Sequence, residues 1–188
     1  QDNMSKYDAF FEEYFPVNRK IILVTCHRRE NFGSGLKNIC EALLQIANKY
    51  PEYQLVYPVH LNPNVSGHVH AILGDTGNIS LLQPQPYDYL VYLLMRSHII
   101  LTDSGGIQEE APALNKPIII LRDTTERPEV IEAGCGVLAG VDTDNIVRLF
   151  SSINDHEEVY QGMINKQNPY GDGTTSAKIA EHFLQFDN

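Results

Sequence analysis

Three segments of the sequence combine glycine with charged or hydroxyl side chains in a way that suits anion binding. The first, HRRENFG at 27–33, follows an apolar run and joins one histidine and two arginines to a glycine. The second, TDSGGIQEE at 102–110, contains two consecutive glycines, whose backbone can approach a ligand closely because no Cβ intervenes. The third, RDTTERPE at 122–129, is dense in charge directly after another apolar run. These segments predict a site for a phosphate or another anion, over which an arginine of the third segment could close.

The first two segments, and His60, also have structural explanations that need no ligand. Arg28 and Glu30 could form a pair of surface charges, and their position alone leaves the two interpretations about even. The double glycine fits a tight turn with Ser104 as helix N-cap equally well. His60, taken alone, is typical of a structural histidine.

Other ligand classes find little support. The GSG at 33–35 lacks the third glycine of a dinucleotide-binding GxGxxG, since Asn38 stands there, and the next strand ends at His60 instead of an acidic residue. No GxxxxGK[ST] phosphate loop is present. His68 and His70 are two apart, so a helix would separate them, and we expect both to be exposed instead of binding a metal.

The elements that must position these residues alternate between strands and helices. Continuous apolar runs predict strands buried on both faces, and apolar residues spaced by three and four predict amphipathic helices. We expect strands at 21–25, 54–59, 79–82, 99–102, 117–121 and 136–138, and helices at 36–50, 65–73, 87–96, 142–153, 157–164 and 176–186. Residues 7–16 make a poor strand and are expected to be a helix or the tail of a preceding domain. Pro112 should kink or end the short helix that follows the double glycine.

This alternation predicts an α/β fold, a Rossmann-like parallel sheet flanked by helices, in a single domain over residues 1–188. Ligands of such sheets bind beyond the carboxyl ends of the strands. The site is therefore expected in the segments that follow the strands, which begin after Thr25, Val59, Leu82, Thr102 and Leu121.

The composition bounds the ligand and the setting. The 188 residues carry 24 acidic and 14 basic side chains, a net charge of −10, which argues against a general nucleic-acid surface or a polybasic membrane anchor. No apolar run reaches the roughly 18–20 residues of a membrane span. Cys26, Cys40 and Cys135 are odd in number and far apart, as expected of reduced thiols in a cytoplasmic protein. The chain begins at Gln1 without an initiator Met, so we expect it to be a piece of a larger protein.

Taken together, five runs resemble the non-hydrolysing UDP-N-acetylglucosamine 2-epimerases. They are HRRENFG at 27–33, PVHLNP at 58–63, LTDSGGIQEEAP at 101–112, KPIIILRDTTERPE at 116–129 and NPYGDG at 168–173. The resemblance extends from about residue 20 to the C-terminus. It implies the nucleotide-binding, C-terminal half of a two-domain fold of the GT-B glycosyltransferase type, whose N-terminal partner half is absent from this chain.

The resemblance also implies a set of UDP-binding residues. They are the catalytic His27 facing the diphosphate, Gln85 and the backbone near Leu90 at the uracil, Ser104, Gly105 and Gly106 at the phosphates, Glu110 at the ribose, and Arg127 on the sugar–phosphate side. Leu90 departs from the aromatic residue of some relatives. Arg28 and His60 match positions that bind a second UDP-N-acetylglucosamine as allosteric activator in some bacterial members.

The reaction that the resemblance implies interconverts UDP-N-acetylglucosamine and UDP-N-acetylmannosamine by elimination and re-addition of UDP. It needs no cofactor or metal, and its catalytic carboxylates lie in the N-terminal half, so this chain alone is expected to be inactive. The expected partners are the UDP-sugar, the N-terminal domain and a second copy of the full protein, which would serve polysaccharide biosynthesis. Two alternatives are a stand-alone nucleotide-sugar-binding module and half of a GT-B glycosyltransferase. The unbroken series of motifs favours the epimerase over the glycosyltransferase, and nothing in these residues separates it from the stand-alone module.

Overall fold

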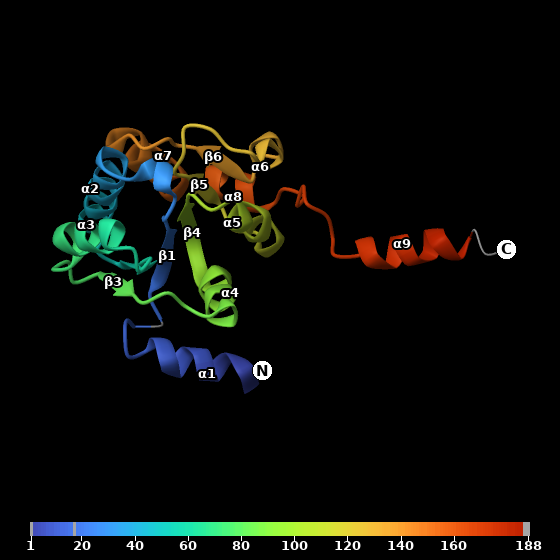
Figure 1. Ribbon diagram of the computed structural model, residues 1–188, viewed down its shortest axis with the longest axis horizontal. Helices are drawn as coiled ribbons and strands as arrows, with labels where there is room; N and C mark the ends of the chain where they lie inside the picture. The colour runs from blue at the N-terminus through green and yellow to red at the C-terminus, as the bar shows by residue number, and fades with distance from the viewer. Residues whose placement is uncertain (1, 17, 186–188) are drawn as a thin grey trace.

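Six parallel strands form the centre of the molecule. The computed structural model describes residues 2–16 and 18–185, and in them the sheet has the order β3-β2-β1-β4-β5-β6 (Figure 1). Every neighbouring pair runs parallel. The strands are β1 (Lys20–Thr25), β2 (Tyr53–Pro58), β3 (Ile79–Leu82), β4 (Ser97–Thr102), β5 (Ile118–Ile120) and β6 (Gly136–Leu138). The predicted α/β, Rossmann-like fold is confirmed, with strand boundaries shifted by at most two residues.

Helices connect the strands and cover both faces of the sheet. They are α1 (Asp2–Phe11), α2 (Ser34–Lys49), α3 (Pro63–Leu73), α4 (Tyr87–Arg96), α5 (Gly105–Glu110), α6 (Pro128–Glu132), α7 (Thr143–Asp155), α8 (Glu157–Ile164) and α9 (Thr175–Leu184), with short 3-10 helices η1 (Arg29–Asn31) and η2 (Ala111–Leu114). As predicted, Pro112 ends a regular helix, because α5 gives way to η2 at Ala111. The N-terminal segment is the helix α1, and the predicted end of the last helix, Phe186, lies outside the described residues.

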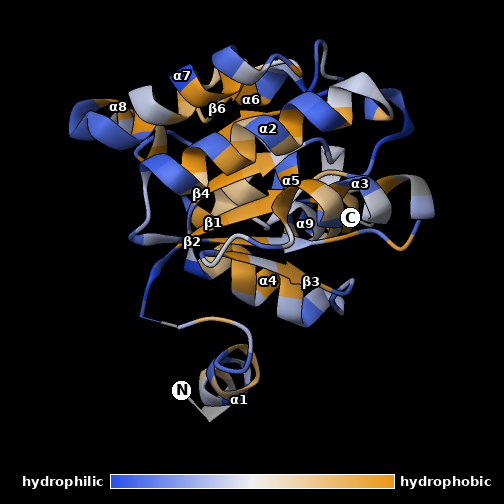
Figure 2. Ribbon diagram, turned by 90° about the vertical axis from the view of Figure 1, so that its left-hand side faces the viewer, coloured by the Kyte–Doolittle hydropathy of each residue, from blue (hydrophilic) through white to orange (hydrophobic). Residues whose placement is uncertain are grey.

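The apolar strands feed two separate core layers. Ile22 and Val24 of β1 pack with α2, α3, α7 and α8 on one face, whereas Ile21 and Leu23 pack with α1, α4, α5 and α6 on the other. Figure 2 shows β1 and β4 between α2 and α4. A strand that is apolar at every position therefore marks a sheet buried on both sides, because alternate side chains enter opposite layers.

The order of the strands places a ligand-binding edge between β1 and β4. Chain progression reverses direction there, since β2 and β3 lie on one side of this pair and β5 and β6 on the other. Connections leaving the two strands diverge and open a crevice at their carboxyl ends. Thr25 and Thr102 are register partners at this edge, and their hydroxyl oxygens are 2.6 Å apart.

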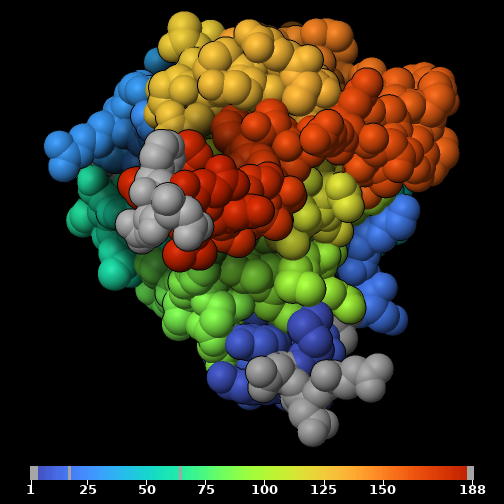
Figure 3. Space-filling view, turned by 90° about the vertical axis from the view of Figure 1, so that its right-hand side faces the viewer, coloured from blue at the N-terminus to red at the C-terminus, as the bar shows by residue number. Residues whose placement is uncertain are grey.

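The last helix stands away from the body of the molecule. In Figure 1, α9 projects to the right at the end of an extended segment, and in Figure 3 its red residues lie nearest the viewer. All of its residues are exposed, among them Ile179, Phe183 and Leu184. No helix among the described residues is long and apolar enough to cross a membrane.

Candidate functional site

A cavity of about 300 Å³ opens at the carboxyl ends of β1, β2 and β4. Seven of the ten residues assigned from the sequence line it: His27, His60, Gln85, Leu90, Ser104, Gly106 and Glu110. Gly105, Arg28 and Arg127 are not among its lining residues. Segments far apart in the sequence thus meet at the switch point of the sheet, where open α/β sheets bind ligands.

Two histidines form one wall of the cavity. The imidazole rings of His27, after β1, and His60, after β2, have centroids 6.0 Å apart and lie nearly parallel, at 13°. The side chain of His27 is 47% exposed, and its Nδ1 lies 3.7 Å from Oδ1 of Asp103. Imidazole nitrogens that face an open cavity beside a carboxylate are suited to donate to an anionic ligand.

The loop carrying His27 is held by Asp103, a role that the sequence analysis missed. Asp103 is completely buried, and its carboxylate accepts hydrogen bonds from the backbone N–H of His27 (3.0 Å) and Arg28 (2.8 Å) and from Nδ2 of Asn31 (3.0 Å). The Cys26 thiol also donates to it at 3.2 Å. Burial, followed by the nearby Asp103 carboxylate, raises the pKa of the Cys26 thiol, which favours its protonated, donating form. The available signal was an acidic residue at the end of a buried strand, directly before Ser-Gly-Gly.

The two consecutive glycines, Gly105 and Gly106, lie in different environments. A Cβ on Gly106 would lie 3.8 Å from Oε1 of Glu110 and 3.9 Å from Oγ of Ser104, which are ordinary contacts at the cavity. A Cβ on Gly105 would lie 3.5 Å from both Arg28 and Glu126, outside the cavity wall. Ser104 occupies the N-cap position of α5, but its side chain makes no capping hydrogen bond, so its hydroxyl is not committed to the helix.

The charged residues after β1 and β5 pair with one another across the loops. Arg28 contacts Glu126 at 2.5 Å, and Arg122 contacts Glu30 at 2.6 Å and also pairs with Glu126. The alternative that Arg28 and Glu30 pair with each other is therefore wrong, since each has a partner on the other loop. The backbone N–H of Glu126 itself, followed by Arg122 and Arg28, lowers the pKa of this carboxyl to about 2.

Arg127 also has a partner in place of an open anion site. Its Nε pairs with the carboxylate of Glu109, and its backbone N–H donates to the Thr125 hydroxyl at 3.0 Å. The sequence predicts an arginine after β5 that closes over the cavity. In this structure Arg127 is held at α5 by Glu109 and does not line the cavity.

The far end of the cavity is more apolar. Pro84, Leu90 and Ile107 line it together with the ring of Tyr87, an aromatic residue that the sequence analysis did not single out. The amide of Gln85 donates to the Gln83 carbonyl at 2.7 Å, while its buried Oε1 has no hydrogen-bond partner among the described residues. An apolar wall beside a buried amide oxygen that lacks a partner suits a heterocyclic base, which combines apolar faces with polar edges.

Glu110 lies at the mouth of this apolar end. The Tyr87 hydroxyl donates to its Oε2 at 2.9 Å, and this hydrogen bond raises the pKa of the Tyr87 phenol. A carboxylate beside a base-sized hollow is placed to accept hydrogen bonds from sugar hydroxyls.

A second hollow adjoins this cavity, since Glu110 lines both. This larger hollow of about 850 Å³ lies between η2 and the NPYGDG run, and Asn115, Tyr170 and Lys178 are among its lining residues. His68 and His70 are both exposed, as predicted. Within the ranges 2–16 and 18–185, no group of three or more His, Cys, Asp or Glu side chains is arranged to hold a metal ion.

Known proteins resemble the chain along nearly its whole length. The sequence model of the UDP-N-acetylglucosamine 2-epimerases matches residues 2–184. The UDP-N-acetylglucosamine 2-epimerase of Neisseria meningitidis serogroup A is 50% identical over 177 residues, which cover 93% of this chain and 48% of the relative. That of Yersinia pestis is 50% identical over 177 residues, covering 94% of this chain and 46% of the relative.

A solved structure gives the same result. The crystal structure of UDP-GlcNAc 2-epimerase from Neisseria meningitidis bound to UDP-GlcNAc superposes with a TM-score of 0.92 at 46% identity, over 98% of this chain and 50% of that one. The chain spans about half the length of the curated relatives it matches. Because the family match covers almost every residue, the chain belongs to the UDP-N-acetylglucosamine 2-epimerase family.

Proposed function

We propose that this chain is the nucleotide-binding half of a UDP-N-acetylglucosamine 2-epimerase and that it holds the UDP part of the substrate in the cavity at the β1–β4 switch point. The observation that carries the proposal is the convergence of His27, Ser104, Gly106, Glu110 and Gln85 on one hollow. The family match over residues 2–184 favours an epimerase over a glycosyltransferase half. The related Neisseria structure is named as bound to UDP-GlcNAc, the ligand class proposed here.

Each part of UDP has a counterpart in the cavity. The diphosphate lies against His27, Ser104 and Gly106, where an imidazole, a free hydroxyl and backbone are open to it. The ribose lies at Glu110, and the uracil lies between the apolar wall and the free Oε1 of Gln85. Local donors are necessary because a chain of net charge −10 repels an anion at long range.

Four assigned residues remain to be placed, three of them outside the cavity wall. Arg127 reaches the sugar–phosphate side by exchanging Glu109 for the ligand, and Gly105 reaches the phosphates next to the Arg28–Glu126 pair. His60 and Arg28 are proposed contacts of an activating second UDP-sugar. His60 lies in the cavity wall beside His27, and Arg28 must first leave Glu126.

The proposed reaction divides the chemistry between two walls of a cleft. A base removes the proton at C2 of the sugar, the electron pair forms the C1–C2 double bond of a glycal, and UDP leaves with the electrons of the C1–O bond. Re-addition of UDP to C1 and return of a proton to the opposite face of C2 give the epimer. Donors such as His27 stabilise the negative charge that develops on the leaving group and retain it for re-addition. The proton-transfer carboxylates belong to the proposed N-terminal half.

The exposed face of α9 supports a partner domain. Ile179 and Phe183 lie four residues apart on the same face of the helix, next to Leu184, and all three are more than half exposed. Isolated helices with such a face normally bury it against another element. We propose that a second Rossmann-like half covers it in a whole protein that is cytoplasmic and homodimeric, in line with the resemblance.

The proposal is tested by filling the cavity without disturbing the fold. A Cβ at Gly106 meets only ordinary contacts, so Gly106→Val should fold and should abolish the binding of UDP measured by calorimetry. Gly67→Val on the exposed face of α3, where nothing lies within 4 Å, is the matched control and should bind UDP as the parent chain does. UDP binding that survives in Gly106→Val would overturn the proposed site.

A second experiment tests whether the proton-transfer carboxylates lie outside this chain. An assay for UDP-N-acetylmannosamine, or for deuterium exchange at C2, should find no turnover by this chain alone, because one wall cannot place a base within about 3 Å of the C2 proton. Turnover by the chain above that of Gly106→Val would place the catalytic carboxylates in this half instead.

A further inference from the structure

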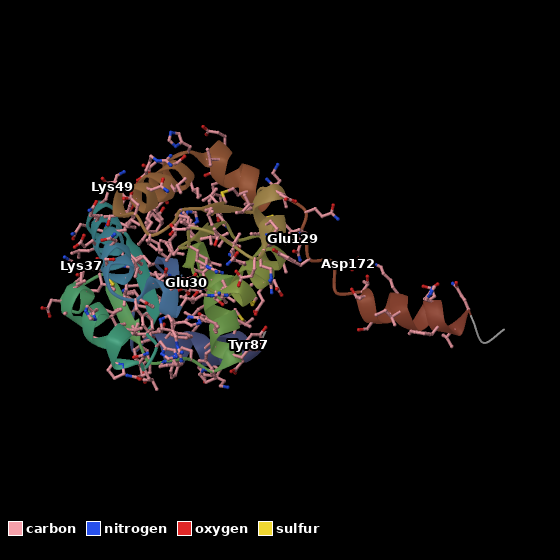
Figure 4. All side chains as sticks on the ribbon, turned by 45° about the horizontal axis from the view of Figure 1, so that its top comes forward. Glu30, Lys37, Lys49, Tyr87, Glu129 and Asp172 are labelled. Atoms are coloured by element: carbon pink, nitrogen blue, oxygen red, sulfur yellow. The ribbon has the colours of Figure 1, made fainter. Side chains whose placement is uncertain are left out.

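Tyr87 connects the apolar wall of the cavity to Glu110, although its position in the sequence gives no hint of this. It is the first residue of α4, follows the helix-starting Pro86, and is 65% exposed. Its ring lines the cavity next to Leu90, and its hydroxyl donates to Oε2 of Glu110 on α5, 23 residues later in the sequence. Figure 4 labels this side chain at the start of α4.

The two carboxylate oxygens of Glu110 differ in their hydrogen bonds. Oε2 is occupied by the Tyr87 hydroxyl, whereas no hydrogen bond from a described residue reaches Oε1. Oε1 is the oxygen on the side of Gly106, 3.8 Å from where a Cβ on that glycine would lie. Oε1 therefore lies between Gly106, where we place the diphosphate, and the rest of the Glu110 side chain, where we place the ribose.

The hydroxyl of Tyr87 also restricts a side chain that otherwise has several rotamers. A glutamate loses conformational entropy when it is fixed, and a ligand must supply that cost if the protein does not. Glu110 is the last residue of α5, where the regular helix ends. The bond from Tyr87 fixes the carboxylate before a ligand arrives.

We propose that Tyr87 is a positioning residue whose hydroxyl holds Glu110 in the orientation that accepts a ribose hydroxyl, so that the site selects ribonucleoside over deoxyribonucleoside diphosphates. This inference rests on the proposed function, since it requires UDP to lie in this cavity. It deepens that function by naming the residue pair that recognises the sugar. A site built to bond a hydroxyl rejects the analogue without it, because its own polar groups are then left unpaired.

The experiment compares two ligands and two backgrounds by calorimetry. UDP and 2′,3′-dideoxy-UDP are titrated into the parent chain, Tyr87→Phe, Glu110→Ala and the double variant. Tyr87→Phe keeps the ring and removes only the hydroxyl, so we expect it to weaken UDP binding about 2- to 10-fold, the worth of one hydrogen bond, and to leave dideoxy-UDP unchanged. In the Glu110→Ala background the same substitution should have no effect on UDP.

The matched control is Tyr14→Phe, a conservative change at another exposed tyrosine far from the cavity, which should leave both affinities unchanged. A parent chain that does not bind UDP would overturn the proposed function together with this inference. If the parent chain binds UDP and prefers it to dideoxy-UDP, but Tyr87→Phe retains that preference, only the inference is wrong. Equal losses for both ligands in Tyr87→Phe also contradict it, because the hydroxyl would then act on another part of the nucleotide.

Discussion

The two ends of the central strands each place a histidine beside the sheet, and the environments of these histidines are opposite. At the amino end, His98 of β4 lies between the rings of Tyr53 and Tyr160, with centroid distances of 5.7 and 4.4 Å. Burial, and to a smaller extent the Lys20 and Lys116 charges, lowers the pKa of His98 to about 4. At the carboxyl end, His27 follows β1 and opens onto the cavity beside Asp103.

The difference follows from the direction of the strands. At their carboxyl ends, diverging connections leave loops whose backbone N–H groups and polar side chains surround a hollow. At the amino end the chain returns from helices, and aromatic residues close over His98 on both sides. The same residue type is thus packed at one edge of the sheet and available to a ligand at the other.

Removing Asp103 should have the largest effect and should destroy the carboxyl edge. Asp103→Ala leaves the backbone N–H groups of His27 and Arg28 without their buried acceptor, whereas the amide of Asn31 keeps its hydrogen bond to the Leu121 carbonyl. Each unpaired buried group costs about 1–3 kcal/mol, so we expect the free energy of unfolding to fall by about 3–5 kcal/mol. Urea unfolding measures the loss.

Asp123→Ala is the control for this change, because Asp123 is an exposed aspartate after the neighbouring strand β5. It should alter the free energy of unfolding by no more than about 0.5 kcal/mol. A similar small effect of Asp103→Ala would mean that the His27 loop is held by other contacts.

Replacing each histidine by phenylalanine should separate binding from packing. His27→Phe removes a donor to the diphosphate, so we expect UDP to bind about 10-fold more weakly, with little change in the free energy of unfolding. His98→Phe keeps a ring between Tyr53 and Tyr160, and calorimetry should find its UDP affinity unchanged. If His98→Phe weakened UDP binding and His27→Phe did not, His98 and not His27 would be the histidine that serves the ligand.

The sequence predicted the frame of the molecule because local patterns determine it. The apolar run of β1 and the spacing of Leu36, Ile39 and Leu43 in α2 are properties of short segments. Because these positions are buried, they must be apolar, and the pattern in the sequence therefore predicts the strand and the helix. The strand-end rule then pointed to the loops after Thr25 and Thr102. Fold class and the location of the cavity follow from such rules.

The partners within the site could not be predicted, because they join distant segments. Arg28 meets Glu126, 98 residues away, in place of Glu30 two residues away. Tyr87 meets Glu110, 23 residues later in the sequence, and it brings an aromatic ring to the wall where Leu90 lacks one. Such pairs depend on how α4, α5 and the loops are placed in space, which periodicity does not specify.

His98 at the amino end of the sheet and Glu126 at the carboxyl end should each make the free energy of unfolding depend on pH, in different pH ranges. The larger effect is expected from His98. Its pKa is about 4 in the folded chain and about 6.5 in the unfolded chain, so the unfolded state binds the proton first. The contribution of neutral His98 is complete above pH 6.5 and is lost as the pH falls toward 4. Since the ring is only half-buried, solvent screening reduces the expected loss to about 1–2 kcal/mol. Unfolding of His98→Phe, measured from pH 7 to 4, should be less pH-dependent than that of the parent chain by this amount, and equal slopes would contradict the prediction.

The smallest effect is expected from Glu126, on the loop after β5. Glu126→Gln removes the charge that pairs with Arg28 and Arg122, and because the side chain is 42% exposed, the cost at pH 7 should be at most about 1 kcal/mol. The pKa of Glu126 is lowered to about 2, so the ionised carboxylate is favoured in the folded chain. Its contribution is present above the unfolded value near 4.5 and is lost as the pH falls through that range toward 2.

The difference between the parent chain and Glu126→Gln should therefore be constant from pH 7 to 5 and shrink below pH 4.5, a lower window than that of His98. Urea unfolding of both chains at pH 7, 5 and 3 measures it, with Glu132→Gln, an exposed glutamate at the end of α6, as the control. A difference that closes between pH 6.5 and 5 instead would assign the effect to a histidine. Because Arg28 loses its carboxylate partner, the same variant should also bind inorganic phosphate more tightly than the parent chain. An unchanged phosphate affinity would show that the ion pair with Glu126 does not restrict phosphate binding by Arg28.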